Sequence, residues 1–142
     1  MFALVARGGE LRARKIDHVS AQTLKAELRK HVSKSATIMT DQLPAYNGLE
    51  NEFAGHEVVD HSAGQYVNGN AYTNTVEGWF SLLKRGVTGT FHHVSDQHLD
   101  RYVDEFVFRY NRRDVSDAER AFMAVKGIEG KHLYCKEPIN KK

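Results

Sequence analysis

The stretch that most constrains this chain runs from Thr73 to Arg85, with the sequence Thr-Asn-Thr-Val-Glu-Gly-Trp-Phe-Ser-Leu-Leu-Lys-Arg. Within it, Glu77 and Lys84 lie seven positions apart, which is close to two turns of an α-helix. A helix here therefore presents a carboxylate and a cation on one face, about 10 Å apart along the helix axis. One partner would meet both charges.

An acid far upstream belongs with this stretch. Asp41 follows the apolar run from Thr37 to Thr40, which predicts a short buried strand. A short helical segment with Pro44 near its start is predicted next. A strand, an acid and then a helix place Asp41 at the carboxyl end of a sheet strand, where α/β folds position their sites. Between Asp41 and Glu77 lie 35 residues.

A strand-end Asp, an interval of this length and a helix that carries Glu with Lys seven residues later together resemble the DDE transposases of the ribonuclease-H-like, retroviral-integrase superfamily. Further segments make the resemblance specific to the insertion-sequence branch called IS-XO-two-like, also written IS fifteen-ninety-five. The resemblance covers about Phe2 to Arg113. The segments that carry it are Asn74 to Glu77, Ser81 to Gly86, Gly89 to Ser95 and Phe106 to Arg113.

The resemblance implies an activity on DNA. Members of the family cut DNA at element ends and join the freed 3′-hydroxyl to a target, without a covalent protein intermediate. Such phosphoryl transfer uses two Mg²⁺ or Mn²⁺ ions about 4 Å apart, held by carboxylate oxygens. By residue-level resemblance to the family's second and third acids, Asp41 and Glu77 are the expected catalytic metal ligands. Asn74 is an alternate ligand or supports one, because some relatives place Asn where others have the acid.

The resemblance also implies contacts with DNA, namely the transposon ends and the target. Lys84 matches a family position thought to contact a phosphate or a terminal base, and Arg85 stands beside it. His92 and His93 lack the Cys or second spaced His pair of a zinc site, so we expect them to contact phosphate or order a loop. A homo-oligomer is a further partner that the sequence leaves open. The expected DNA-binding residues are Lys84, Arg85, His92, His93, Arg112 and Arg113.

Each candidate also has a purely structural interpretation. Asn74 followed three residues later by Glu77 is a capping-box-like pair that would open a helix. Asp41 would cap the helical segment after it. Lys84 and the two later arginines end helices, where cations interact favourably with the helix dipole. The spacing from Asp41 and the match at Lys84 favour the catalytic interpretation of Glu77.

The chain departs from the family pattern at its start. The family carries its first catalytic Asp on a strand immediately before the hairpin with which this chain opens, and neither Glu10 nor Asp17 matches that position. Tyr72 stands where relatives usually have His. We therefore expect an α/β, ribonuclease-H-like mixed sheet flanked by helices and missing its first strand, in a truncated transposase that is inactive or nearly so alone. The alternatives are a noncatalytic DNA-binding or dimerising remnant and a decayed gene product.

The remaining pattern predicts one domain, with a partial catalytic core over residues 1–113 and a C-terminal helix and irregular tail over residues 114–142. Basic residues at positions 12, 14 and 15 are expected to protect an outer strand. Trp79, Phe80, Leu82 and Leu83 are expected in the core. The other expected elements are strands Phe2 to Ala6, Leu11 to Ile16 and Gly55 to His61, and helices from Ser20 to about Val32, from Ser95 and from Val115 to Val125.

Composition adds a few limits. With 142 residues, of which 41% are hydrophobic, the chain is long enough to bury a real core. The formal net charge of +2 is a poor argument for nucleic acid binding. One cysteine, Cys135, rules out an internal disulfide and is compatible with a reducing compartment. No apolar run approaches the roughly 20 residues of a membrane span, and we expect a soluble, cytoplasmic protein.

Overall fold

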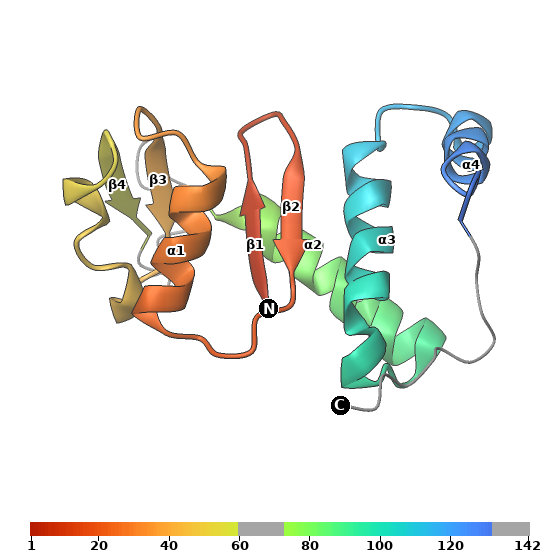
Figure 1. Ribbon diagram of the computed structural model, residues 1–142, viewed down its shortest axis with the longest axis horizontal. Helices are drawn as coiled ribbons and strands as arrows, with labels where there is room; N and C mark the ends of the chain where they lie inside the picture. The colour runs from red at the N-terminus through yellow and green to blue at the C-terminus, as the bar shows by residue number, and fades with distance from the viewer. Residues whose placement is uncertain (60–72, 132–142) are drawn as a thin grey trace.

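The computed structural model describes residues 1–59 and 73–131 (Figure 1). Strands and helices both contribute, which confirms the α/β class. Short 3₁₀ turns at Pro44–Tyr46, Leu49–Asn51 and Asp96–His98 and a π-helical segment at Gly86–Phe91 connect the main elements. Those elements are β1 (Phe2–Val5), β2 (Leu11–Arg14), α1 (Ala21–His31), β3 (Thr37–Thr40), β4 (Gly55–Val58), α2 (Asn74–Arg85), α3 (Leu99–Asn111) and α4 (Asp117–Lys126).

Within residues 1–59 and 73–131 the strands form two separate two-stranded sheets, whereas the sequence predicts one mixed sheet. Strands β1 and β2 pair antiparallel, with Val5 opposite Leu11. Strands β3 and β4 pair parallel, with Thr37 opposite Gly55. Figure 1 shows the β1–β2 hairpin standing between the β3–β4 pair and α3, with β1 and β3 running in opposite directions. Within the described ranges, β1 and β3 do not pair with each other.

The hairpin turn explains how β1 reverses into β2. Gly9 donates its N–H to the Ala6 carbonyl at 2.9 Å, and Ala6 donates to the Glu10 carbonyl at 2.9 Å. Gly8 has a φ of +66°, a conformation that side chains disfavour and glycine adopts freely. The turn confirms the predicted hairpin, although β2 ends two residues before the predicted Ile16.

The hairpin separates two apolar clusters because successive side chains of a strand point to opposite faces. Phe2 and Leu4 belong to the cluster around α1. Ala3 and Val5 pack on the cluster between α2 and α3. The buried members are Phe2, Leu24, Leu28, Ile38, Leu49 and Phe53 in the first cluster and Leu11, Trp79, Leu83 and Val103 in the second.

Helix α1 begins where the sequence predicts. The Ser20 side chain accepts a hydrogen bond from the Thr23 N–H at 3.1 Å, which satisfies one of the unpaired donors at a helix start. Leu24 and Leu28 are the buried residues of its inner face. On its outer face, the Arg29 guanidinium pairs with Glu52 at 2.6 Å, so the helix is tied to the segment that leads into β4.

Helices α2 and α3 pack closely, with three differences from the sequence-based expectation. Trp79 and Leu83 are buried as predicted, but Leu82 is 49% exposed, because it lies on the outer side of α2. Ser95 precedes a 3₁₀ turn instead of α3, which begins at Leu99. The segment after α2, expected as a glycine-containing connection, is π-helical over Gly86–Phe91.

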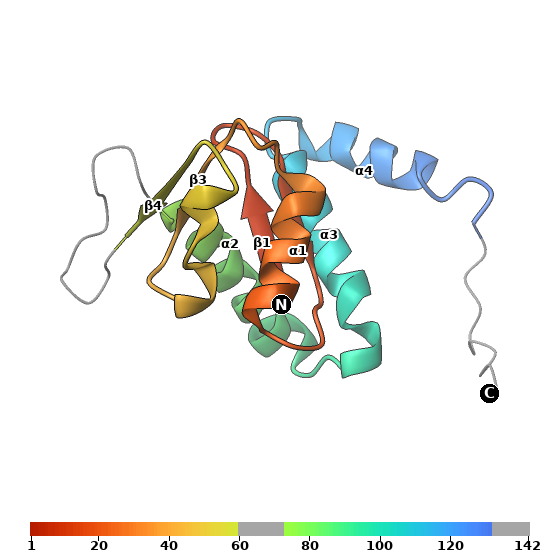
Figure 2. The same ribbon diagram turned by 60° about the vertical axis from the view of Figure 1, so that its left-hand side comes forward.

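Helix α4 projects to one side of α3 (Figure 2). Ser116 and Glu119 form a capping box at its start, in which the Ser116 backbone N–H donates to the Glu119 carboxylate at 3.0 Å. This confirms a helix close to the predicted Val115 to Val125. No helix in the described part of the chain is long and apolar enough to cross a membrane. Tyr72, Cys135 and the end of the strand predicted to reach His61 lie outside the described residues.

Candidate functional site

Asp41 lies where the sequence predicts, directly after β3. Its side chain is exposed, and its Oδ1 accepts a hydrogen bond from the Leu43 N–H at 3.3 Å. This bond orders the turn before Pro44–Tyr46, but Asp41 does not cap that segment, because its N-cap is Leu43 and no side chain caps it. Burial raises the pKa of the Tyr46 hydroxyl, and the nearby Asp41 carboxylate raises it further. A carboxylate with this exposure can hold a local bond and still meet a ligand from solvent.

Glu77 lies in the first turn of α2 and is exposed. The Thr73 hydroxyl donates a hydrogen bond to its carboxylate. The predicted capping box between Asn74 and Glu77 does not form, because the N-cap is Thr73 and Asn74 is already the first helical residue. Asn74 itself is exposed. The helix start therefore lies at the predicted Thr73, whose hydroxyl bonds to Glu77 in place of the predicted Asn74 pair.

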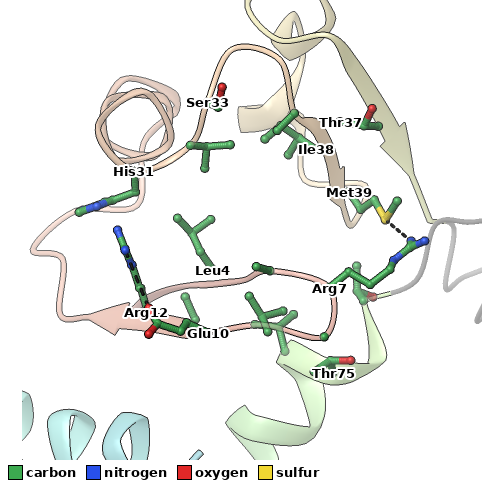
Figure 3. Close-up of a pocket in the computed structure, with 18 residues that line it drawn as sticks. Leu4, Arg7, Glu10, Arg12, His31, Ser33, Thr37, Ile38, Met39 and Thr75 are labelled. Atoms are coloured by element: carbon green, nitrogen blue, oxygen red, sulfur yellow. Dashed lines mark hydrogen bonds and ion pairs between the residues drawn. The ribbon is translucent and has the colours of Figure 1, made fainter. Parts of the chain in front are cut away.

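A cavity of about 720 Å³ lies beside β3 and the first turn of α2. Its wall includes β3 through Met39, two residues before Asp41, and the α2 residues Thr75 and Val76, which adjoin Glu77. Figure 3 shows Thr75 below the β1 edge of this cavity and Met39 across from it. Arg7 closes one side, since its Nη2 lies 3.2 Å from the Met39 sulfur. Neither Asp41 nor Glu77 is among the residues that line this cavity.

The described residues do not gather three potential metal ligands in one place. No group of three or more His, Cys, Asp or Glu side chains arranged to hold a metal ion occurs in residues 1–59 and 73–131. Asp41 and Glu77 supply hard oxygen ligands of the kind that Mg²⁺ prefers. Two such acids alone do not make the ligand set of a two-metal site, so a complete site requires a further group.

The cations of α2 follow the predicted helical geometry. Lys84 and Arg85 occupy the last turn and are both exposed. Because α2 is a regular helix from Asn74 to Arg85, Glu77 and Lys84 share a face and lie about 10 Å apart along its axis. The helix therefore presents a carboxylate near its start and two cations near its end.

His92 and His93 follow the π-helical segment and are exposed. His92 has a φ of 58°, which is uncommon for a residue with a side chain. The His93 N–H donates to the Phe91 carbonyl at 2.6 Å across this tight turn. The turn places both imidazoles at the surface after the π-helical segment.

Arg112 and Arg113 lie at the other end of α3 from the histidines. Both are exposed, and the Arg113 guanidinium stacks 4.5 Å from the centre of the Tyr110 ring. Arg112 Nη1 donates to the Asn111 carbonyl at 3.1 Å. Because α3 has 13 residues, it spans about 20 Å. The predicted DNA-binding residues therefore fall into two groups, one between the end of α2 and the start of α3 and one at the far end of α3.

The sequence reading missed the residue that joins α3 to the hairpin. Asn111 accepts from the Leu11 N–H at 2.7 Å and donates to the Leu11 carbonyl at 2.8 Å. The Lys15 N–H donates to Asp100 at 3.0 Å in the same way. Asn111 directly follows the apolar stripe of α3. A polar residue at that position could have indicated a hydrogen bond to a neighbouring element.

These features define a class of protein. It is a mixed α/β domain with one acid after a strand, one acid on a helix and exposed cations at the end of that helix. Comparison with known proteins is more specific: the chain matches the family model of the ISXO2-like transposase domain over residues 1–111. It belongs to that family. A protein of Halobacterium salinarum, described as an uncharacterized protein in transposable element ISH50, is 32% identical over 111 residues.

That relative is the longer protein. The match covers 77% of this chain and 37% of the Halobacterium protein. The chain therefore spans less than half the length of that relative. No solved structure matches the chain, so its fold is described from its own coordinates.

Proposed function

We propose that this chain forms part of a DDE-type transposase domain with a ribonuclease-H-like arrangement. In this proposal Asp41 and Glu77 are two of the acids that bind Mg²⁺ or Mn²⁺, and Asn74 supports them. Lys84 and Arg85 contact the DNA backbone. The substrates are the ends of an insertion element and a target DNA.

The observation that carries the proposal is the shared cavity between β3 and the first turn of α2. Met39 and Thr75 line it together, and each lies two residues from one of the acids. Membership of the transposase family supports assigning these acids to DNA chemistry. Metal ions, when bound, would activate the nucleophile and stabilise the leaving oxygen. The residues of this chain would orient the DNA and provide two oxygen ligands.

The absence of a three-ligand group among the described residues leads us to propose little or no activity for this chain alone. The test is a plasmid-nicking assay with Mg²⁺ or Mn²⁺. We expect no nicking above that of an Asp41→Ala, Glu77→Ala double variant. Nicking by the unmodified chain that both single substitutions abolish would contradict the proposed inactivity and support the two acids as ligands.

DNA binding provides a separate test of the α2 face. Salt-sensitive binding in the absence of divalent metal is expected, because phosphate contacts release counterions. Lys84→Ala with Arg85→Ala should weaken binding and reduce the salt dependence by about one unit per lost contact. The control is Lys30→Ala, which removes an exposed cation from α1. Equal binding by the Lys84, Arg85 variant and the control would reject this face.

A noncatalytic DNA-binding or dimerising remnant is the second candidate. The cations and imidazoles of residues 84 to 93 are exposed, and this favours binding even where the acids do not complete a metal site. Binding without nicking would support this candidate. Competition with an intact transposase for the same DNA would measure its consequence.

A further inference from the structure

We propose that His56 is a positioning residue for Asp41 and acts on it through the hydroxyl of Thr40. His56 lies on β4, which pairs with the strand that ends before Asp41 (Figure 1). The inference rests on the proposed function, in which Asp41 is a metal ligand, and it adds the residues that hold the Asp41 backbone in place. His56, Thr40 and Asp41 are called the β3-end network below.

Two hydrogen bonds connect the members of the β3-end network. Oγ1 of Thr40 lies 2.9 Å from Nε2 of His56, and the Thr40 hydroxyl donates to the Asp41 carbonyl at 2.8 Å. In the parallel pairing of β3 with β4, His56 stands opposite Ile38, two residues before Thr40. The imidazole therefore reaches along the strands toward the end of β3, where Asp41 lies.

The direction of these bonds determines where His56 carries its proton. A hydroxyl has one proton to donate, and that of Thr40 goes to the Asp41 carbonyl. The Thr40 oxygen therefore accepts from His56, and Nε2 of His56 donates. Nε2 carries a proton both in the charged imidazole and in one neutral tautomer, so the bond to Thr40 persists when the ring changes its charge.

The other ring nitrogen of His56 faces Glu50. Nδ1 lies 3.7 Å from the Glu50 carboxylate. Glu50 belongs to the 3₁₀ turn Leu49–Asn51, and the fully buried Leu49 anchors this turn in the α1 cluster. In residues 1–59 and 73–131, no group of three potential metal ligands includes His56. These contacts favour a role in orienting neighbours over direct metal binding.

Burial holds the β3-end network in one arrangement. The His56 side chain is 6% exposed and Thr40 is 7% exposed, whereas the Asp41 side chain is exposed. A buried donor or acceptor that loses its partner is strongly disfavoured. His56 and Thr40 therefore stay bonded to each other while the Asp41 carboxylate remains accessible to a ligand.

The network fixes the backbone on both sides of the Asp41 Cα. The Thr40 carbonyl, before it, accepts from the Val59 N–H at 2.9 Å. The Asp41 carbonyl, after it, accepts from the Thr40 hydroxyl. An exposed carboxylate thus projects from an immobilised backbone. Loss of a group that orients a metal ligand typically weakens metal binding by about 10–100-fold.

NMR of the His56 ring in the full ¹⁵N-labelled chain, without metal, tests the bond itself. We expect an Nε2–H signal that exchanges slowly with water, because the proton is buried and hydrogen-bonded. Thr40→Val should remove this signal and Thr40→Ser should retain it. The exposed His93 ring is the reference and should show no such signal. Absence of an Nε2–H signal for His56, or a proton on Nδ1 alone, would overturn the proposal.

Mn²⁺ affinity tests the effect of the network on Asp41. Mn²⁺ broadens the NMR signals of nearby amides, so the Gln42 amide reports even weak binding beside Asp41. Thr40→Val removes the hydroxyl at nearly constant shape, and His56→Leu removes the ring donor. Both should weaken Mn²⁺ binding about tenfold or more.

Conservative variants separate positioning from packing. Thr40→Ser and His56→Gln keep a hydrogen-bond donor at each position, so both should restore binding to near that of the unmodified chain. Equal affinities for Thr40→Val and Thr40→Ser, or for His56→Leu and His56→Gln, would overturn the proposal.

Val59→Ala is the control for a general loss of stability. Val59 is fully buried directly after β4, and its truncation destabilises the fold while it keeps every hydrogen-bonding group of the network. The folded variant should bind Mn²⁺ as tightly as the unmodified chain. Weakening equal to that of Thr40→Val would show that these residues act through stability alone and would overturn the proposal.

Asp41→Ala distinguishes failure of this inference from failure of the proposed function. Mn²⁺ binding that depends on Asp41 but not on Thr40 or His56 would reject the network and leave Asp41 as a ligand. No Mn²⁺ effect at Gln42, or an effect that Asp41→Ala leaves unchanged, would reject Asp41 as a ligand and the inference with it. Binding that all three positions support is the expected result.

Discussion

The two edges of the β1–β2 hairpin differ in what meets them. The β2 edge is closed by α3, where Asn111 bonds to both backbone groups of Leu11. The β1 edge faces a cavity of about 720 Å³, beyond which lies the edge of β3. Among the described residues, the two edges of one hairpin thus have different neighbours. The difference teaches that the packing of α3 supplies side-chain partners to the backbone of β2, whereas the described residues beside β1 line a cavity.

The closed edge depends on the packing of α3 against the hairpin, so the largest expected effect comes from its buried tryptophan. Trp79 is 2% exposed, and its Nε1 donates to the Phe106 carbonyl at 3.3 Å. Trp79→Ala should lower the free energy of unfolding by about 3–5 kcal/mol. Leu82→Ala on the outer side of α2 should cost about 0.5 kcal/mol. Urea unfolding measures both, and equal costs would contradict the assigned core.

Asn111→Ala tests the closure of the β2 edge itself. It removes two hydrogen bonds and leaves the Leu11 groups partly buried without partners. We expect a loss of about 2–3 kcal/mol in the free energy of unfolding, together with faster aggregation, because the edge opens. Asp104→Ala, an exposed position of α3, is the control. If Asn111→Ala lowers the free energy of unfolding no more than Asp104→Ala does, Asn111 does not close the β2 edge.

Two glycine substitutions in and after α2 test how closely α2 packs against α3. A Cβ at Gly86 would lie 2.3 Å from Cζ of Phe106, whereas one at Gly78 would meet nothing within 4 Å. Gly86→Ala should therefore destabilise the protein by about 1–3 kcal/mol through overpacking. Gly78→Ala should stabilise it by up to about 1 kcal/mol, since alanine favours helix. Thermal unfolding of both variants provides the measurement, and the two shifts should have opposite signs.

The smallest expected effect lies at the ion pair between Arg29 of α1 and Glu52. The Arg29 guanidinium lowers the pKa of the Glu52 carboxyl below its usual 4.5. A lowered folded-state pKa means that the pair's contribution is present above pH 4.5 and is lost as pH falls through the folded value. Glu52→Gln should flatten the stability profile in that acidic range. An unchanged profile would show that the pair contributes nothing measurable.

The sequence predicted the local elements well where periodicity and caps agreed. Ser20 begins α1 as its hydroxyl suggested, and Asp41 follows β3 because an apolar run ended there. The helix that carries Glu77 and Lys84 begins within one residue of the predicted Thr73. These features depend on a few neighbouring residues, so one sequence was sufficient to predict them.

The parts that the sequence did not predict depend on distant contacts. The division into two sheets reflects which edges find a partner, and no local pattern encodes it. Asn111 acts on Leu11 across 100 positions of chain, a pairing that spacing alone does not suggest. Leu82 was predicted in the core because it is apolar, but its place on α2 turns it outward. The metal-ligand roles of Asp41 and Glu77 remain predictions.

Amide hydrogen exchange of the unliganded protein tests the central claim, that one edge is closed and the other open. Leu4 and Leu11 amides should exchange slowly, because Leu4 pairs with β2 and Leu11 pairs with Asn111. The Val5 amide should exchange quickly, because it points away from β2, whereas the amides of Leu4 and Ala6 before and after it point toward β2. This alternation within β1 is the predicted result. Equal protection of Leu4 and Val5 would contradict it and show that the β1 edge already has a partner.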